Sequence, residues 1–200
     1  MLFYLIRHGE SEGNLNQVHS GWGAWNLTEK GRQQALAVGE RLRKLPPFDQ
    51  IYVSDLVRTR QTFELAFGAD TPHILSPLIR EINTAPFVGL SIPMLRETLG
   101  KSYTDCTKNM DYSPYGGECG EHMKARVKAF YDRVTAQDPQ PERVAVVCHG
   151  GVIRCTFAIA TGMPARDVRI VAGNCGVTVL KYEEGVWRLI QLNHTPEIYQ

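Results

Sequence analysis

The sequence lacks a strong charge of either sign. In 200 residues, 22 lysines and arginines face 21 acidic residues, which gives a formal charge of +1. A protein that holds nucleic acid or an anionic membrane through its surface field needs a marked positive excess. We therefore expect neither partner, and any anion that the protein binds must be held by a few well-placed groups.

Long hydrophobic runs and paired cysteines are also missing. No apolar stretch approaches the roughly 18 residues of a membrane span, and the run at residues 1–6, which Arg7 ends, is too short for a span or a signal peptide. The five cysteines form no CxxC pair. Such usage is typical of a reducing compartment rather than of a disulfide framework or a zinc site, so we expect a cytoplasmic protein.

Apolar patterns along the chain alternate between strands and helices. The expected strands, each a short apolar run, are 2–6, 50–53, 143–148, 176–182 and 186–192. The expected helices are one that Thr28 caps and Pro46-Pro47 ends, one within 55–67, one around 123–134 and one at 152–160. This alternation predicts an α/β domain with a mostly parallel sheet.

No change in composition along the chain marks a linker between domains. We expect a single domain over residues 1–200. Within it, the pattern at 82–117 is irregular, because Pro86, Pro93 and Pro114 interrupt it. We interpret this segment as a long excursion over the surface that serves as a lid or a specificity element.

Two of the predicted strands end in the same way. The first leads into Arg7-His8-Gly9 and the other into Cys148-His149-Gly150-Gly151. Ligands of open α/β sheets bind beyond the carboxyl ends of the strands, and glycine allows close approach of backbone and ligand. Each histidine alone could be a core or capping residue, but the pair favours a site in which imidazoles act on a substrate.

Arginines and an amide accompany the histidines. Arg7 adjoins His8, and Arg58 follows the strand at 50–53, whereas we expect Arg60 to be a surface residue. Guanidinium groups match the oxygens of a phosphoryl group in pairs. Asn14, six residues after His8, adds an amide donor without adding charge. The combination indicates a site for a phosphoryl group.

Several motifs in this order resemble the histidine phosphatase superfamily, the phosphoglycerate-mutase-like fold. They are Arg7-His-Gly-Glu-Ser-Glu-Gly-Asn14, Gly21-Trp22, Leu27-Thr-Glu-Lys-Gly-Arg-Gln-Gln-Ala35, Ser54 to Thr62, Glu81, Gly116-Gly117-Glu118 and His149-Gly-Gly-Val-Ile-Arg154. These landmarks span most of the chain. The resemblance implies a three-layer α/β sandwich, with a mostly parallel sheet and helices on both faces.

The resemblance also implies a phosphatase that acts on a small phosphomonoester in two steps. His8 would attack phosphorus to form a phosphohistidine that water then hydrolyses, while its other ring nitrogen donates to the carbonyl of Gly9. The phosphate pocket would consist of Arg7, Asn14, Arg58, His149 and the amide of Gly150, with Ser20 and Gly21 also touching the phosphoryl group. The arginines would stabilise the transferred group electrostatically.

Glu81 is the general acid and base that the resemblance implies. From the residues alone, Glu81 could instead form an ion pair with Arg80. We expect no metal and no cofactor, because the sequence has no cluster of metal-ligand spacing. The other histidines, His19, His73, His122 and His194, are expected at the surface or in caps. Trp22 and Trp25 are expected to pack, close enough to line the site.

Substrate specificity does not follow from the resemblance. Ala85-Pro-Phe-Val-Gly89 stands where many phosphatases of the family carry Gly-x-Trp-Glu-Gly, so the wall of the pocket differs. Family mutases place an Arg-Arg pair in the excursion, which here holds only Arg96, Lys101 and Lys108 as cations. Hydrolysis is therefore favoured over a bisphosphoglycerate-dependent phosphoglycerate mutase, although an arginine from elsewhere would restore that alternative.

Two further alternatives are open. Cys148 and Arg154 have the Cys-x5-Arg spacing of cysteine-dependent phosphatases, a spacing that arises easily by chance. A phosphate-binding module without activity is the other alternative, but such a module is expected to lack one of the site residues. The sequence does not decide between a monomer and a homodimer.

Overall fold

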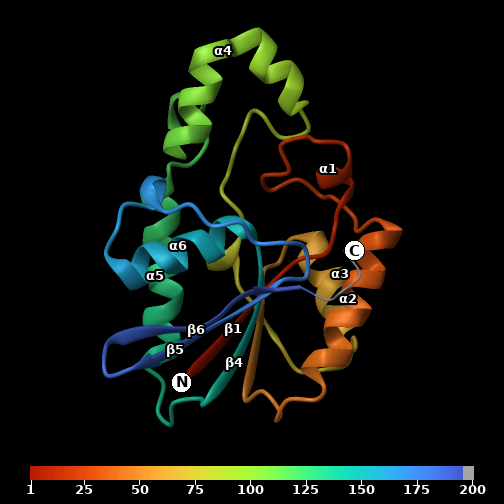
Figure 1. Cartoon of the computed structure of the whole chain (residues 1–200), viewed down its shortest axis with the longest axis vertical. Helices are drawn as coiled ribbons and strands as arrows, with labels where there is room; N and C mark the ends of the chain where they lie inside the picture. Colours follow the sequence, from red (N-terminus) through yellow and green to blue (C-terminus); the bar gives the residue numbers. More distant parts are fainter. Residues whose placement is uncertain (196–200) are drawn as a thin grey trace.

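A computed structural model describes residues 1–195 as a mixed sheet between two layers of helices (Figure 1). The strands are β1 (Leu2–Arg7), β2 (Gln50–Val53), β3 (Ile74–Leu75), β4 (Arg143–Cys148), β5 (Val177–Glu183) and β6 (Val186–His194). The helices are α1 (Glu12–Leu15), α2 (Glu29–Leu42), α3 (Val57–Phe67), α4 (Ile92–Asn109), α5 (Gly120–Thr135) and α6 (Gly150–Thr161). Short 3-10 turns lie at Pro77–Ile79, Ser113–Tyr115 and Ala165–Asp167.

The strand order is β3-β2-β4-β1-β5-β6. Strands β1, β2, β3 and β4 pair in parallel, and β5 and β6 add antiparallel pairs at the β1 side. The predicted mostly parallel α/β sheet is therefore confirmed. Strands β1 and β4 are adjacent because both are apolar on both faces, and a strand of this kind is stable only when it is covered from both sides.

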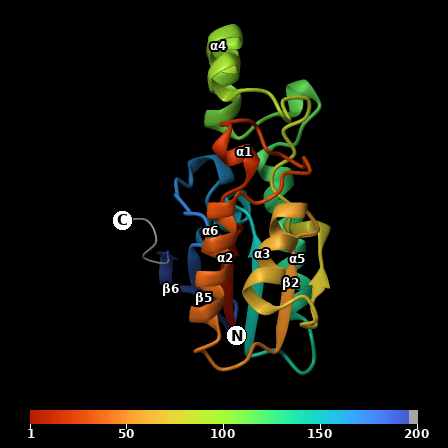
Figure 2. The ribbon, with the colours of Figure 1, turned by 90° about the vertical axis from the view of Figure 1, so that its right-hand side faces the viewer.

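Each face of the sheet has its own core. Ile6 and Val147 pack on one face with side chains of α2 and α3, including Val38 and Phe63. On the other face, side chains of β1 and β4 pack with α5 and α6, where Val127 is fully buried. Figure 2 shows α2 and α3 on one side of the sheet. Helix α2 begins as expected, with the Thr28 hydroxyl accepting a hydrogen bond from the Gly31 amide, but it ends at Leu42, before Pro46.

The excursion at 82–117 is more regular than the sequence predicted. It contains helix α4, which stands beyond the carboxyl ends of β1 and β4 (Figure 1). Pro93 does not break this helix, because it lies in the first turn, where an amide hydrogen has no intrahelical partner. The kink comes from Gly100, whose φ of 50° and ψ of −119° are open to glycine alone. Within residues 1–195, no helix combines the length and apolarity that crossing a bilayer requires.

Candidate active site

Parallel pairing of β1 and β4 brings the two catalytic-type histidines together. Arg7 is in register with Cys148, and the His8 amide donates to the Cys148 carbonyl at 3.0 Å. The rings of His8 and His149 therefore lie 5.2 Å apart between centroids, and both side chains are buried. The sequence predicted this juxtaposition from the two strand ends.

The hydrogen bonds of His8 show which of its two ring nitrogens carries the hydrogen. Its Nδ1 lies 2.7 Å from the Gly9 carbonyl, and the Nε of Arg58 donates to its Nε2 at 3.3 Å. Nδ1 must therefore carry the hydrogen while Nε2 keeps its lone pair. Burial lowers the pKa of His8 well below its usual value, and the charges of Arg58 and Arg7 lower it further. The ring is therefore neutral, with a nucleophilic nitrogen at Nε2.

Arg58 is fully buried in the first turn of α3. Besides its bond to His8, it donates from Nη2 to the Gly21 carbonyl at 2.9 Å and from Nη1 to the Gly23 carbonyl at 3.3 Å. Burial lowers the pKa of Arg58 to about 10, although the charge of Glu81 acts in the opposite direction. At neutral pH Arg58 is therefore charged, and it connects His8 with the loop that contains Gly21.

His149 is fully buried next to His8 and does not line the cavity in the described part of the chain. Its Nε2 lies 2.9 Å from the Ser54 hydroxyl, while its buried Nδ1 has no hydrogen-bond partner within residues 1–195. Burial lowers the pKa of His149 well below the usual value, and the charge of Arg58 adds to this effect. A buried donor without a partner is costly, which fits a ring that completes its hydrogen bonds when a ligand is bound.

Asn14 is held by a capping box at the start of α1. Its Oδ1 accepts from the Ser11 amide at 3.1 Å and from the Asn174 amide group at 3.3 Å. Because the oxygen is engaged, the NH2 group is the part of Asn14 that can donate to an anion. Asn174, which also donates to the His8 carbonyl at 3.0 Å, was not predicted, since nothing nearby in the sequence connects it with His8.

Glu81 does not pair with Arg80, which instead forms an ion pair with Asp55. The carboxylate of Glu81 accepts hydrogen bonds from the amides of Ile82 at 2.9 Å and Gly151 at 3.2 Å. A Cβ on Gly151 would collide with Oε1 of Glu81. The glycine at the start of α6 therefore allows the carboxylate to approach the backbone beside the two histidines.

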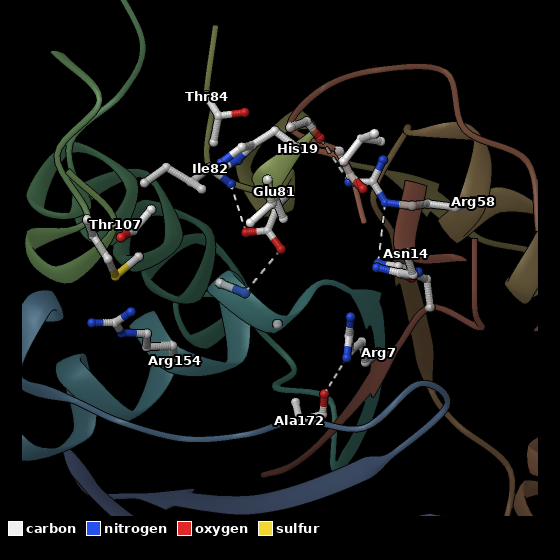
Figure 3. Close-up of a pocket in the computed structure, with 18 of the residues that line it drawn as sticks. Arg7, Asn14, His19, Arg58, Glu81, Ile82, Thr84, Thr107, Arg154 and Ala172 are labelled. Atoms are coloured by element: carbon white, nitrogen blue, oxygen red, sulfur yellow. Dashed lines mark hydrogen bonds between the residues drawn. The ribbon is translucent and has the colours of Figure 1, made fainter. Parts of the chain in front are cut away.

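A cavity of about 470 Å³ lies among these groups (Figure 3). Of the residues predicted for the site, Arg7, His8, Asn14, Ser20, Gly21, Arg58, Glu81 and Gly150 line it. The more distant part of the wall includes Thr84, Thr107, Met110, Tyr112 and Arg154. None of the excursion's cations, Arg96, Lys101 and Lys108, lines the cavity in the described part of the chain, whereas Arg154 of α6 does.

The expectation for His19 was wrong, whereas the two tryptophans pack on neighbouring residues as expected. His19 is buried rather than exposed, and its Nε2 lies 2.6 Å from the hydroxyl of Tyr103 on α4. Neither tryptophan lines the cavity. Trp22 stacks on Arg80 and donates to the Glu81 carbonyl, and Trp25 donates to the Ser20 carbonyl at 3.0 Å. Both indoles therefore support the chain that carries site residues.

The fold and this site define a class of protein. Residues 3–195 match the model of the histidine phosphatase superfamily (branch 1), and the chain belongs to this family. The match confirms the resemblance that the motifs indicated.

Two curated relatives differ in their names. The chain is 31% identical over 189 residues to a probable phosphoglycerate mutase of Erwinia tasmaniensis, covering 92% of this chain and 86% of that protein. It is 32% identical over 197 residues to an adenosylcobalamin/alpha-ribazole phosphatase of Salmonella typhi, covering 96% and 91%. Among solved structures, a mycobacterial glucosyl-3-phosphoglycerate phosphatase in complex with VO3 has a TM-score of 0.84 at 25% identity, covering 97% and 99%. The relatives thus include phosphatases and a mutase.

Proposed function

We propose that this protein is a phosphatase that hydrolyses a small phosphomonoester through a covalent phosphohistidine at His8. The observation that supports this most directly is the pair of hydrogen bonds on the His8 ring. Nδ1 lies 2.7 Å from the Gly9 carbonyl, which leaves the Nε2 lone pair for attack, 3.3 Å from the guanidinium of Arg58. A neutral imidazole beside a fixed cation is suited to receive a phosphoryl group.

In the first step, the lone pair of His8 Nε2 forms a bond to phosphorus while the bond from phosphorus to the ester oxygen breaks. Arg7, Arg58, the Asn14 amide and the Gly150 amide, which line the cavity, hold the phosphoryl oxygens. The buried Nδ1 of His149, which does not line the cavity, joins them when the bound phosphoryl group reaches it. Their role is electrostatic, since charge is spread over these oxygens in the transition state. Glu81, which lines the same cavity, gives its proton to the departing oxygen, and an alcohol leaves.

In the second step, water attacks the phosphorus of the phosphohistidine. The Glu81 carboxylate takes a proton from the water as the new oxygen–phosphorus bond forms. The bond between phosphorus and Nε2 breaks, and its electron pair returns to His8. Inorganic phosphate leaves, and both residues are back in their starting states.

A rapid-quench experiment with ³²P-labelled substrate tests this proposal. The expected result is a phosphoprotein that is labile in acid and stable in base, formed and lost at rates that match turnover. His8→Ala should abolish both label and hydrolysis, while Arg60→Lys, a change at an exposed residue on the same helix as Arg58, should preserve both. Turnover without label on His8 would contradict the proposal.

A phosphoglycerate mutase is the second candidate, and one observation favours it. Arg154 supplies the cavity with a cation outside the phosphate pocket, where the carboxylate of a phosphoglycerate would find a partner. Two of its donors are already engaged, Nε with the Ala165 carbonyl at 3.0 Å and Nη2 with the Arg166 carbonyl at 2.9 Å. Incubation with 3-phosphoglycerate and 2,3-bisphosphoglycerate decides between the candidates, because a mutase yields 2-phosphoglycerate and a phosphatase yields free phosphate.

A further inference from the structure

Arg126 of α5 uses all of its donors within the protein. Its side chain is 15% exposed, and it meets Glu118 in a two-pronged ion pair, Nε to Oε1 at 2.7 Å and Nη2 to Oε2 at 2.9 Å. Paired, bidentate contacts of this kind fix both the distance and the orientation of the two groups. The guanidinium is therefore held in one position.

The other donors of Arg126 bind the segment that ends in Glu81. Nη1 donates to the carbonyls of Leu78 at 2.9 Å and Arg80 at 2.8 Å, and Nη2 donates to the Glu81 carbonyl at 2.9 Å. Residues 80–87 include no helix and no strand, so their backbone groups lack the partners that regular structure supplies. The Arg126 side chain thus supplies hydrogen bonds to backbone carbonyls that, in a helix or a strand, would be paired with backbone amides.

Glu118 holds the chain on the other side of Glu81. Its Oε2 accepts from the Asn83 amide at 3.2 Å, and its own amide donates to the Asn83 carbonyl at 2.8 Å. Close approach here requires the preceding glycine, since a Cβ on Gly117 would lie 2.7 Å from the Asn83 carbonyl oxygen. This contact explains why the Gly116-Gly117-Glu118 motif has glycine at 117 and glutamate at 118, which the sequence alone did not explain.

We propose that Arg126 and Glu118 are positioning residues that hold the Glu81 carboxyl at the reacting oxygen. Neither lines the cavity, so neither touches substrate. They fix the backbone before and after Glu81, and the carboxylate then reaches the amides of Gly151 and Ile82. A proton donor on an irregular segment works only if its position is fixed within a fraction of an ångström. The inference rests on the proposed role of Glu81 in proton transfer.

Two substrates whose leaving groups differ in their need for a proton test the inference. An alkyl ester such as glycerol phosphate needs a proton on its departing oxygen, whereas p-nitrophenolate departs readily without one. Arg126→Lys keeps the charge but loses the five-donor fork. We expect kcat/KM to fall about tenfold or more for the alkyl ester and less than about threefold for the aryl ester, because general-acid catalysis is worth roughly 10²–10⁴ in rate.

Glu81→Gln provides the reference pattern. It should show the same selective loss on the alkyl ester, and the double variant with Arg126→Lys should be no slower than Glu81→Gln alone. Arg43→Lys is the control, since Arg43 also donates to a backbone carbonyl, that of Ala66, away from the cavity. It should leave both substrates unaffected. Glu118→Gln repeats the test in case Arg126→Lys does not fold.

Equal losses on the two esters, or additive losses in the double variant, would show that the ion pair acts only on general stability and would overturn the inference. If Glu81→Gln itself fails to distinguish the esters, the role of Glu81 in the proposed function is wrong, and the positioning role falls with it. The ³²P label on His8 separates these outcomes, because phosphohistidine formation does not depend on which residue protonates the leaving group.

Discussion

The guanidinium Nε of Arg58 lies 3.3 Å from His8 Nε2, so a buried cation is hydrogen-bonded to the lone pair of the proposed nucleophile. The same guanidinium donates to the carbonyls of Gly21 and Gly23. Arg58 thus acts on three parts of the site at once. Its charge adds to burial in lowering the pKa of His8, it donates to the backbone of the Gly21 loop, and it would supply positive charge to bound phosphoryl oxygens.

Arg58→Lys should reduce kcat/KM by about 10²–10³, the usual loss when a preorganised donor to the transition state is removed. A lysine retains the charge but has no planar fork to serve His8 and two carbonyls together. Steady-state kinetics with p-nitrophenyl phosphate measures the loss. Arg60→Lys, two positions along α3 and exposed, is the matched control and should change the rate little. Comparable rates for the two variants would contradict this account of Arg58.

Stability should depend on pH through the buried histidines. Burial lowers the pKa of both His8 and His149 in the folded protein, whereas in the unfolded chain they titrate near 6.5. As the pH falls below about 6.5, the unfolded state takes up protons that the folded state does not, so the free energy of unfolding falls. Above that pH their contribution is fully present.

Each buried histidine contributes a slope of up to about 1.4 kcal/mol per pH unit in this window. Urea unfolding between pH 5 and 7.5, in buffers free of phosphate, measures it. His8→Asn should make the slope shallower by about that amount. A wild-type stability that is constant from pH 7 to pH 5 would contradict the prediction.

Cys148→Ser should spare turnover. The Cys148 side chain is fully buried on β4, and burial raises the pKa of its thiol far above neutral pH, so it is not a thiolate. The buried hydroxyl should lower the free energy of unfolding by about 1–3 kcal/mol, while kcat changes less than about twofold. A phosphatase assay and a denaturation curve measure the two effects. Loss of activity in a folded Cys148→Ser protein would move the nucleophile from His8 to Cys148.

The sequence predicted those parts of the fold and site that depend on neighbours along the chain. Strands β1, β2 and β4 are marked by apolar runs, and His8 and His149 follow two of them directly. Their meeting required only that parallel strands end at one edge of a sheet. The local pattern was therefore enough to predict that His8, the proposed nucleophile, and His149 lie side by side.

Other features depend on contacts between segments that are distant in the sequence, and a local sequence pattern cannot predict such contacts. Helix α4 was not predicted, because Pro93 looks like a break until its position in the first turn of the helix is known. Asn174 is 166 residues from His8, and Tyr103 is 84 residues from His19. Arg126 looks like any exposed helical arginine until Glu118 and residues 78–81 are placed around it. Arg154 lines the cavity because of where α6 lies relative to α4 and the strand ends, which the sequence does not show.

Gly151→Ala should separate stability from activity. Gly151 lies in the first turn of α6, so an alanine there favours the helix by up to about 1 kcal/mol. Its Cβ, however, would collide with Glu81 Oε1 and lie 3.0 Å from the flexible end of Met123. The melting temperature should therefore change little while the carboxyl is displaced from the reacting oxygen. We expect kcat/KM for glycerol phosphate to fall by about 10², with p-nitrophenyl phosphate as the internal control that loses much less. If Gly151→Ala hydrolyses both esters at the wild-type rate, catalysis does not require the Glu81 carboxylate to lie against the backbone of Gly151. Glu81 would then not be the proton donor.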